Sequence, residues 1–229
     1  MKRAARILVP LFALLALGSC QQLFTTSLGA WAARDLSIPA DLSAADTLDY
    51  AGQAVGNGDA ELAEALLPAL VENIDEPGVL EAAADVLVFA TGADGAIDEA
   101  TLVLLEVMES GVAPTQDQID EITAAIAAIA VSADAMTIMQ AMAADPSSLT
   151  PDQLALAGII LIASIADDAV IADALANDDP SAIDAAVTGD PAYDTAYALV
   201  AAAAAAAPGD GSSIADLLAN FIGSMPTPT

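Results

Sequence analysis

Residues 114 to 131 decide the fold, and they read PTQDQIDEITAAIAAIAV. Isoleucines recur in this stretch at intervals of three and four, which is the spacing of one face of an α-helix: they are Ile119, Ile122, Ile126 and Ile129. Thr115 and Gln118 have the spacing of a capping box, in which each side chain bonds the backbone amide of the other residue. The stretch therefore predicts a helix that begins just after Pro114 and buries an isoleucine stripe.

Prolines recur along the chain at nearly regular intervals. Prolines divide it at spacings of 38, 37, 37 and 40 residues, namely Pro39, Pro77, Pro114, Pro151 and Pro191. A second mark, read as a turn or a helix N-cap, falls 16 to 20 residues into each module: Asn57-Gly58-Asp59, Asp94-Gly95, Ser132-Ala133-Asp134, Asp167-Asp168 and Pro208-Gly209-Asp210-Gly211. Each module is therefore predicted to hold two helices.

Local signals agree with helix starts at these prolines. Thr150 and Gln153 form a second capping box with Pro151 at the first helical position, and Asp190 before Pro191 gives another cap. The first module has its own apolar stripe, made of Leu62, Leu66, Leu70 and Ile74. Strand signals are nearly absent. We expect an all-α fold of about five stacked helical hairpins over residues 39 to 225, with no sheet.

In module length and hairpin plan the chain is similar to α-solenoids of the tetratricopeptide and HEAT types. It lacks their consensus residues, so no binding residue is carried over, and an irregular helical bundle is the alternative arrangement. Some prolines fall outside the phase: Pro68, Pro146, Pro180 and Pro208. Pro68 would lie inside a helix and should kink it.

Two apolar segments are too short to cross a membrane. Residues 154 to 166 are nearly all apolar, and residues 197 to 207 are mostly alanine. Each covers about a dozen residues, whereas a spanning helix needs about 20. We interpret both as helices buried on most sides, and we expect the alanine helix to pack at a tight crossing.

The N-terminus has the order of an export signal. Three cations, Lys2, Arg3 and Arg6, precede an apolar run from Ile7 to Leu17 that is too short to span a bilayer. Residues 1 to 19 are therefore predicted to be a signal peptide, and the mature chain would begin at residue 20.

The run Leu17-Gly18-Ser19-Cys20 follows, and it resembles the lipobox of bacterial lipoproteins, although Gly18 is a less usual choice at its position. The resemblance covers about twenty residues. It implies that the thiol of Cys20 is alkylated by diacylglycerol and that the peptide is cut between Ser19 and Cys20. The new amine often receives a further fatty acyl chain such as palmitate. Cys20 is the only cysteine, so the alternative of an internal disulfide is excluded.

The mature chain is extremely acidic. One arginine, Arg34, remains against 33 acids, which leaves a net charge of −32. Such a surface repels nucleic acid and anionic headgroups, and its self-repulsion should destabilise the compact state at low ionic strength. The acidity could reflect habitat, or it could attract cations or a basic partner. A hydrophobic content of 56% and a mean hydropathy of +0.62 argue against disorder.

The ends of the mature chain have separate interpretations. Residues 20 to 38 form a tether in which Phe24, Leu28 and Trp31 share one helical face. This face could rest at the membrane interface, or it could cap the exposed core of the first hairpin. Residues 226 to 229 are expected to form a frayed tail.

The residue types exclude most catalytic chemistry. The chain has no histidine, its one thiol is assigned to lipid, and it has no glycine-rich phosphate loop. Zinc and haem sites therefore lack their usual ligands. Paired carboxylates can hydrolyse glycosides, but the lone Trp31 lies in the tether, away from any sugar platform. The sequence predicts no enzyme and no cofactor.

One segment is a weak metal candidate. Asp94 to Asp98 match the middle of an EF-hand loop, but positions one, three and twelve of that loop would be Ala90, Gly92 and Thr101. The main ligands, including the bidentate acid, are missing. A turn with an N-cap is the favoured interpretation of Asp94 and Asp98, and diffuse cations are expected at the acidic surface.

These features predict a lipid-anchored helical scaffold of the bacterial cell envelope that binds a protein partner. Gln21 after the cysteine favours the outer membrane, because an Asp there would favour inner-membrane retention in enteric-type sorting. The alternatives are a structural or cation-buffering surface lipoprotein and a carrier of an apolar ligand. A scaffold should expose an apolar or mixed patch, a coat protein should show acids on every side, and a carrier should enclose an apolar cavity.

Overall fold

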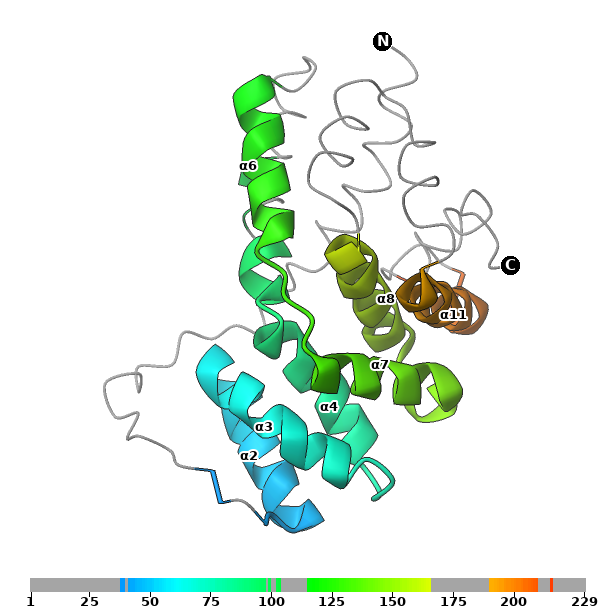
Figure 1. Ribbon diagram of the computed structural model, residues 1–229. Helices are drawn as coiled ribbons and strands as arrows, with labels where there is room; N and C mark the ends of the chain where they lie inside the picture. The colour runs from blue at the N-terminus through cyan, green and yellow to red at the C-terminus, as the bar shows by residue number, and fades with distance from the viewer. Residues whose placement is uncertain are drawn as a thin grey trace.

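A computed structural model describes residues 38–39, 41–97, 99, 102–103, 115–165, 190–209 and 215. All regular elements in these ranges are helices, which confirms the all-α prediction (Figure 1). They are α2 (Ala44–Asn57), α3 (Ala60–Glu72), α4 (Val79–Ala90), α6 (Gln116–Ala127), α7 (Ala133–Ala144), the 3-10 turn η2 (Pro146–Ser148), α8 (Pro151–Ile165) and α11 (Pro191–Ala206).

Both predicted capping boxes are present. The amide of Gln118 donates to Thr115 Oγ1 at 3.3 Å, and the amide of Thr115 donates to Gln118 Oε1 at 3.0 Å. Thr150 and Gln153 make the same exchange at 3.2 and 3.0 Å, with Pro151 as the first residue of α8. Because these bonds satisfy amides that a helix leaves unpaired, they fix where α6 and α8 begin.

The remaining phased prolines also precede helices. Asp190 Oδ1 accepts the amide of Ala192 at 2.8 Å, so α11 opens on the predicted cap and first-turn proline. Helix α4 begins at Val79, two residues after Pro77, and α2 begins shortly after Pro39. The regular spacing of these prolines therefore predicted the start of one helix in every module.

The turn or N-cap predicted in the middle of each module is found in two modules and lies elsewhere in a third. Gly58 ends α2 with a φ of 62°, and Asp59 caps α3 by accepting the amide of Leu62 at 3.0 Å. Ser132 caps α7 in the same way through the amide of Ala135. In the module from Pro77 the turn falls at residues 91–92, so the predicted turn at Asp94-Gly95 lies inside a helical segment, residues 93–97. The marks at residues 167–168 and 210–211 lie outside the described residues.

The expected apolar stripes form the core. Ile119, Ile122 and Ile129 are buried, and Ile126 is half-buried. In α3 the leucines at 62, 66 and 70 are buried, and the helix continues through Pro68, whose ring is exposed. Ile74, the fourth residue of this predicted stripe, lies half-buried in the turn after α3. Helical periodicity therefore predicted the inward faces, because a side chain's direction depends on its position in the helical turn.

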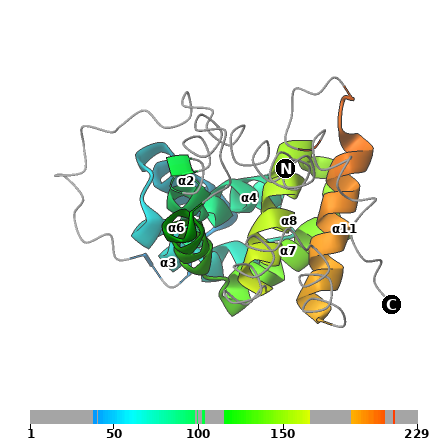
Figure 2. The ribbon, with the colours of Figure 1, turned by 90° about the horizontal axis from the view of Figure 1, so that it is seen from above.

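Helix α4 lies between the two ends of the body. It contacts α2 and α3 on one side and α7 and α8 on the other. Figure 2 shows α2 and α3 to one side of α4, with α8 and α11 to the other. Helix α7 joins the two sides because it packs on α3, α4 and α11.

These contacts favour the bundle over the solenoid. In a solenoid each module contacts only its neighbours, whereas here α4 of the second module packs against α8 of the fourth. The third module also departs from the hairpin plan, because α6 runs away from α7 instead of packing along it (Figure 1). The described body is therefore an irregular helical bundle, the second of the two arrangements expected.

The alanine-rich helix does pack at a tight crossing. Helices α8 and α11 share the most extensive contact of the described helices, and Gly158 lies at its centre. A Cβ atom added to Gly158 would meet Val200 Cγ2 at 2.6 Å and the carbonyl oxygen of Ala196 at 3.3 Å. The absence of a side chain at residue 158 therefore sets how closely the two helices approach.

Several predicted segments lie outside the described residues. They include the signal peptide, residues 1 to 19, the tether up to residue 37, and the tail, residues 226 to 229. Ile38, the last residue of the predicted tether, is half-buried and packs on the core.

Candidate functional site

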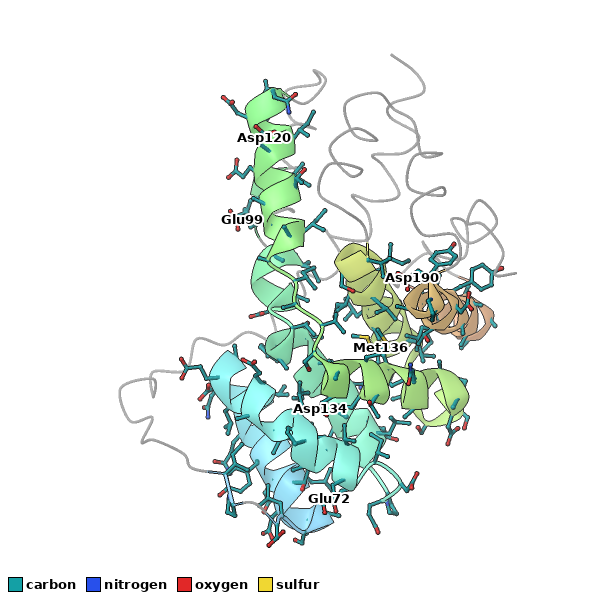
Figure 3. All side chains as sticks on the ribbon, in the orientation of Figure 1. Glu72, Glu99, Asp120, Asp134, Met136 and Asp190 are labelled. Carbon is teal, nitrogen blue, oxygen red and sulfur yellow. The ribbon has the colours of Figure 1, made fainter. Side chains whose placement is uncertain are left out.

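The described part of the surface carries many carboxylates and no basic side chain. The sequence has no lysine, arginine or histidine after Arg34, so no two side chains beyond that residue can form an ion pair with each other. All described acids are exposed or half-buried, and the only buried polar side chains in these ranges are threonines. Figure 3 labels Glu72, Glu99, Asp120, Asp134 and Asp190, which lie on several parts of the body.

The ends of the helices show how the fold accommodates these acids. Every described α-helix carries an acid in its first turn, where the helix dipole is positive. The same helices carry no basic residue in the last turn, where a cation would be stabilising. The dipoles are thus matched at one end of each helix only.

An open depression of about 480 Å³ lies between α4 and α8. Its lining residues are Gly78, Glu81, Ala82, Asp85, Ser148, Thr150 and Gln153. Gln153 Nε2 crosses from α8 and donates to Asp85 Oδ1 at 2.8 Å and to the carbonyl oxygen of Glu81 at 3.4 Å. The side chain of Gln153 therefore caps α8 and also joins α8 to α4 by hydrogen bonds.

The chemistry of this depression suits water or cations better than an apolar ligand. Its side chains are mainly carboxylate, hydroxyl and amide, and it opens to solvent, whereas carrier sites are enclosed and mostly apolar. Sequence reasoning identified Gln153 as a capping residue and missed its contact with Asp85. The spacing of residues along α8 carries no information about which helix lies opposite.

The EF-hand candidate does not have the shape of a calcium loop. Asp94 lies in the helical segment 93–97, and Gly95, at the position that needs a sharp turn, is helical as well. Asp98 lies outside the described residues. Within the ranges that the structure describes, no three acids, cysteines or histidines come close enough together to hold a metal ion.

The predicted lipidation site cannot be placed in the fold. Ser19 and Cys20 belong to the part of the chain that the structure does not describe, as do Gln21 and Trp31. Among the described helices, none is both long enough and apolar enough to span a bilayer.

Comparison with protein-family models, with curated proteins and with solved structures finds no match to this chain.

Proposed function

We propose that this chain is a lipid-anchored protein of the bacterial cell envelope, held at the outer membrane through Cys20. The order of the N-terminal residues carries the proposal: three cations, a short apolar run and then Leu17-Gly18-Ser19-Cys20. A thiol at this position, with no second cysteine to pair with it, is available for diacylglycerol. Two or three acyl chains would hold the protein durably, whereas one chain binds reversibly.

We further propose that the helical body is a scaffold for a protein partner with a cationic surface. Leu102 is the one large hydrophobic side chain strongly exposed among the described residues, and carboxylates lie on every described α-helix. A partner would therefore meet charge and polar groups instead of an apolar groove. Opposite charge gives fast encounter and selectivity in such complexes.

A second role has support from the same surface. By the criterion given in the sequence analysis, acids on all described α-helices match the surface expected of a structural or cation-buffering coat more closely than that of a scaffold with an apolar patch. The carrier alternative has less support, because the depression between α4 and α8 is open and polar.

The anchor is tested by expressing Cys20→Ser in a bacterial host and following lipid labelling and membrane fractionation. We expect labelling to disappear and the protein to leave the membrane fraction. The double variant Cys20→Ser/Ser37→Cys is the matched control, since it restores a thiol away from the signal, and it should remain unlabelled. Full membrane retention of Cys20→Ser would contradict the anchor.

The scaffold is tested by cross-linking the lipidated protein in cells and isolating it at two salt concentrations. One partner in fixed stoichiometry, released as salt rises, would support electrostatic recognition because salt screens exposed charges. Uptake of many cations without a protein partner would favour the coat.

A further inference from the structure

The turn between α2 and α3 contains the dipeptide Asn57-Gly58, in which an asparagine is chemically most reactive. The chain has four asparagines, Asn57, Asn73, Asn177 and Asn220, and only Asn57 is followed by a glycine. Glycine has no side chain to hinder attack of its backbone nitrogen on the amide carbon of the preceding asparagine. Asn57 and Gly58 are both exposed, so water reaches them. Asn57 is therefore the asparagine most prone to lose its side-chain amide.

The closed turn holds this dipeptide in an unreactive conformation. Asn57 is the last residue of α2, and Gly58 ends the helix with a φ of 62° and a ψ of 37°. The amide of Gly58 donates to the carbonyl oxygen of Val55 at 3.2 Å. The amide of Asp59 donates to the carbonyl oxygen of Ala54 at 2.9 Å. The nitrogen of Gly58 must leave its acceptor and lose its proton before it can attack, so these capping bonds oppose the reaction.

The end of α2 is built to open easily. Gly52 and Gly56 both lie in its second half, and both are exposed. A glycine inside a helix costs about 0.5–1 kcal/mol relative to alanine, because it loses more backbone entropy. Helix ends also open locally at a lower free energy than the core. The protection of Asn57 therefore lasts only while this turn is closed.

We infer that Asn57 is a site of spontaneous deamidation, and that opening of the turn between α2 and α3 controls its rate. In the open turn the nitrogen of Gly58 gives its proton to water or hydroxide, and its electron pair forms a bond to Asn57 Cγ. The bond from Cγ to the side-chain nitrogen breaks, and that nitrogen takes up a proton and leaves as ammonia. Water then opens the cyclic succinimide at either carbonyl group, which gives aspartate or isoaspartate. The net reaction consumes water, releases ammonia and needs no oxidant.

Both products weaken the turn in which they form. Aspartate at residue 57 adds a negative charge to the carbonyl end of α2, which is already negative, two residues before Asp59. Isoaspartate also inserts a carbon atom into the backbone before Gly58, which displaces the two capping amides from their acceptors. Gly58 lies over α4, since a Cβ atom built on it would be 3.8 Å from Phe89 Cε1. Deamidation therefore loosens α2 and α3 irreversibly, whether or not the chain carries a lipid.

Peptide mass spectrometry tests the site on the full-length chain, kept for weeks in a non-ionic detergent at mildly alkaline pH. Exchange of the amide group for a hydroxyl group should appear at Asn57. Asn73 is the internal control, because its side-chain amide donates to the carbonyl oxygen of Ala69 at 2.9 Å and the branched Ile74 follows it. We expect its deamidation to be about tenfold slower or more. Equal rates at the two asparagines, or no loss of amide from Asn57, would overturn the inference.

The same measurement in urea tests the control by the turn. Unfolding removes the capping bonds, so we expect the rate at Asn57 to rise about threefold or more. A rate that is equal or lower in urea would show that the closed turn does not protect Asn57.

Two variants at residue 57 separate the reaction from its consequence. Asn57→Gln keeps a side-chain amide but moves its carbon one methylene farther from the nitrogen of Gly58, so we expect no mass change. Asn57→Asp carries the charge of the product without the extra backbone carbon. Hydrogen–deuterium exchange in α2 and α3 should become about threefold faster or more as the unsubstituted chain ages, and should stay constant in Asn57→Gln. Fresh Asn57→Asp should lie between the fresh and the aged unsubstituted chain. Unchanged exchange in the aged chain, or equal acceleration in Asn57→Gln, would overturn the loosening.

Discussion

Helices α3 and α4 contact each other and bury large side chains in the core, whereas α8 and α11, which also bury large side chains, approach each other over a glycine. The first pair contributes leucines of α3 and Val86, Leu87 and Phe89 of α4 to that core. The second brings the backbone of Gly158 against Ala196 and Val200. The first pair is stabilised mainly by buried apolar area, and the second depends also on the fit of two backbones. Substitutions that change area and substitutions that change shape should therefore affect the two regions differently.

The largest effect is expected from truncating a leucine of the close pair. Leu161→Ala, at a fully buried position of α8, should lower the free energy of unfolding by about 2–5 kcal/mol, because it removes apolar contact and leaves a cavity. Leu66→Ala in α3, where the side chain is equally buried, should cost an amount in the same range. Urea unfolding measures both, since urea is uncharged and leaves screening unchanged. A loss below about 1 kcal/mol for either variant would contradict the tight burial of that leucine.

A single added methyl group tests the crossing itself. Gly158→Ala should destabilise the protein by about 1–3 kcal/mol, because the new Cβ would lie 2.6 Å from Val200 Cγ2 and force the helices apart. The double variant Gly158→Ala/Val200→Ala should recover much of the lost free energy of unfolding, since it removes Val200 Cγ2, the atom that the new Cβ would clash with. If Gly158→Ala were neutral, the crossing would not set the spacing of α8 and α11.

Two aspartate caps compare the electrostatics of the two regions. Asp59 caps α3 and Asp190 caps α11, and each accepts a backbone amide near 3 Å. Replacing either by alanine should cost about 0.5–2 kcal/mol at high salt. At low salt we expect either replacement to cost less than at high salt, because removing one carboxylate from a chain with a net charge of −29 relieves repulsion that salt no longer screens. Thermal unfolding at two NaCl concentrations measures both costs, and a larger cost at low salt would contradict this expectation.

The smallest expected effect is a stabilisation of the protein. Gly52 is exposed within α2, and a Cβ atom built on it meets nothing within 4 Å. Gly52→Ala should therefore stabilise the protein by about 0.5–1 kcal/mol, because alanine loses less backbone entropy in a helix. The same change at Gly52 and Gly158 should thus move the unfolding midpoint in opposite directions, and a midpoint lowered by both variants would show that α2 is not free at this position.

Much of the fold could be predicted because its signals are local. The capping boxes at Thr115 and Thr150 each depend on residues three apart, and the chain folds at these places as their spacing predicts. The turn expected at Asp94-Gly95 was misplaced by about three residues, since Gly92, with a φ of 70°, takes the left-handed conformation instead. Both glycines permit a turn, and which one adopts it depends on how the following helix packs.

The sequence by itself determined where helices begin, which faces turn inward and how much negative charge the body carries, because these depend on residues within one or two helical turns and on composition. Only the tertiary structure decided that α4 packs against α8, that Gln153 reaches Asp85 and that Gly158 lies under Val200. The last two contacts join residues that are 68 and 42 positions apart in the chain. The choice between a solenoid and a bundle depends on which apolar faces meet, and many pairings of similar alanine- and leucine-rich faces bury comparable area, so that periodicity cannot distinguish them.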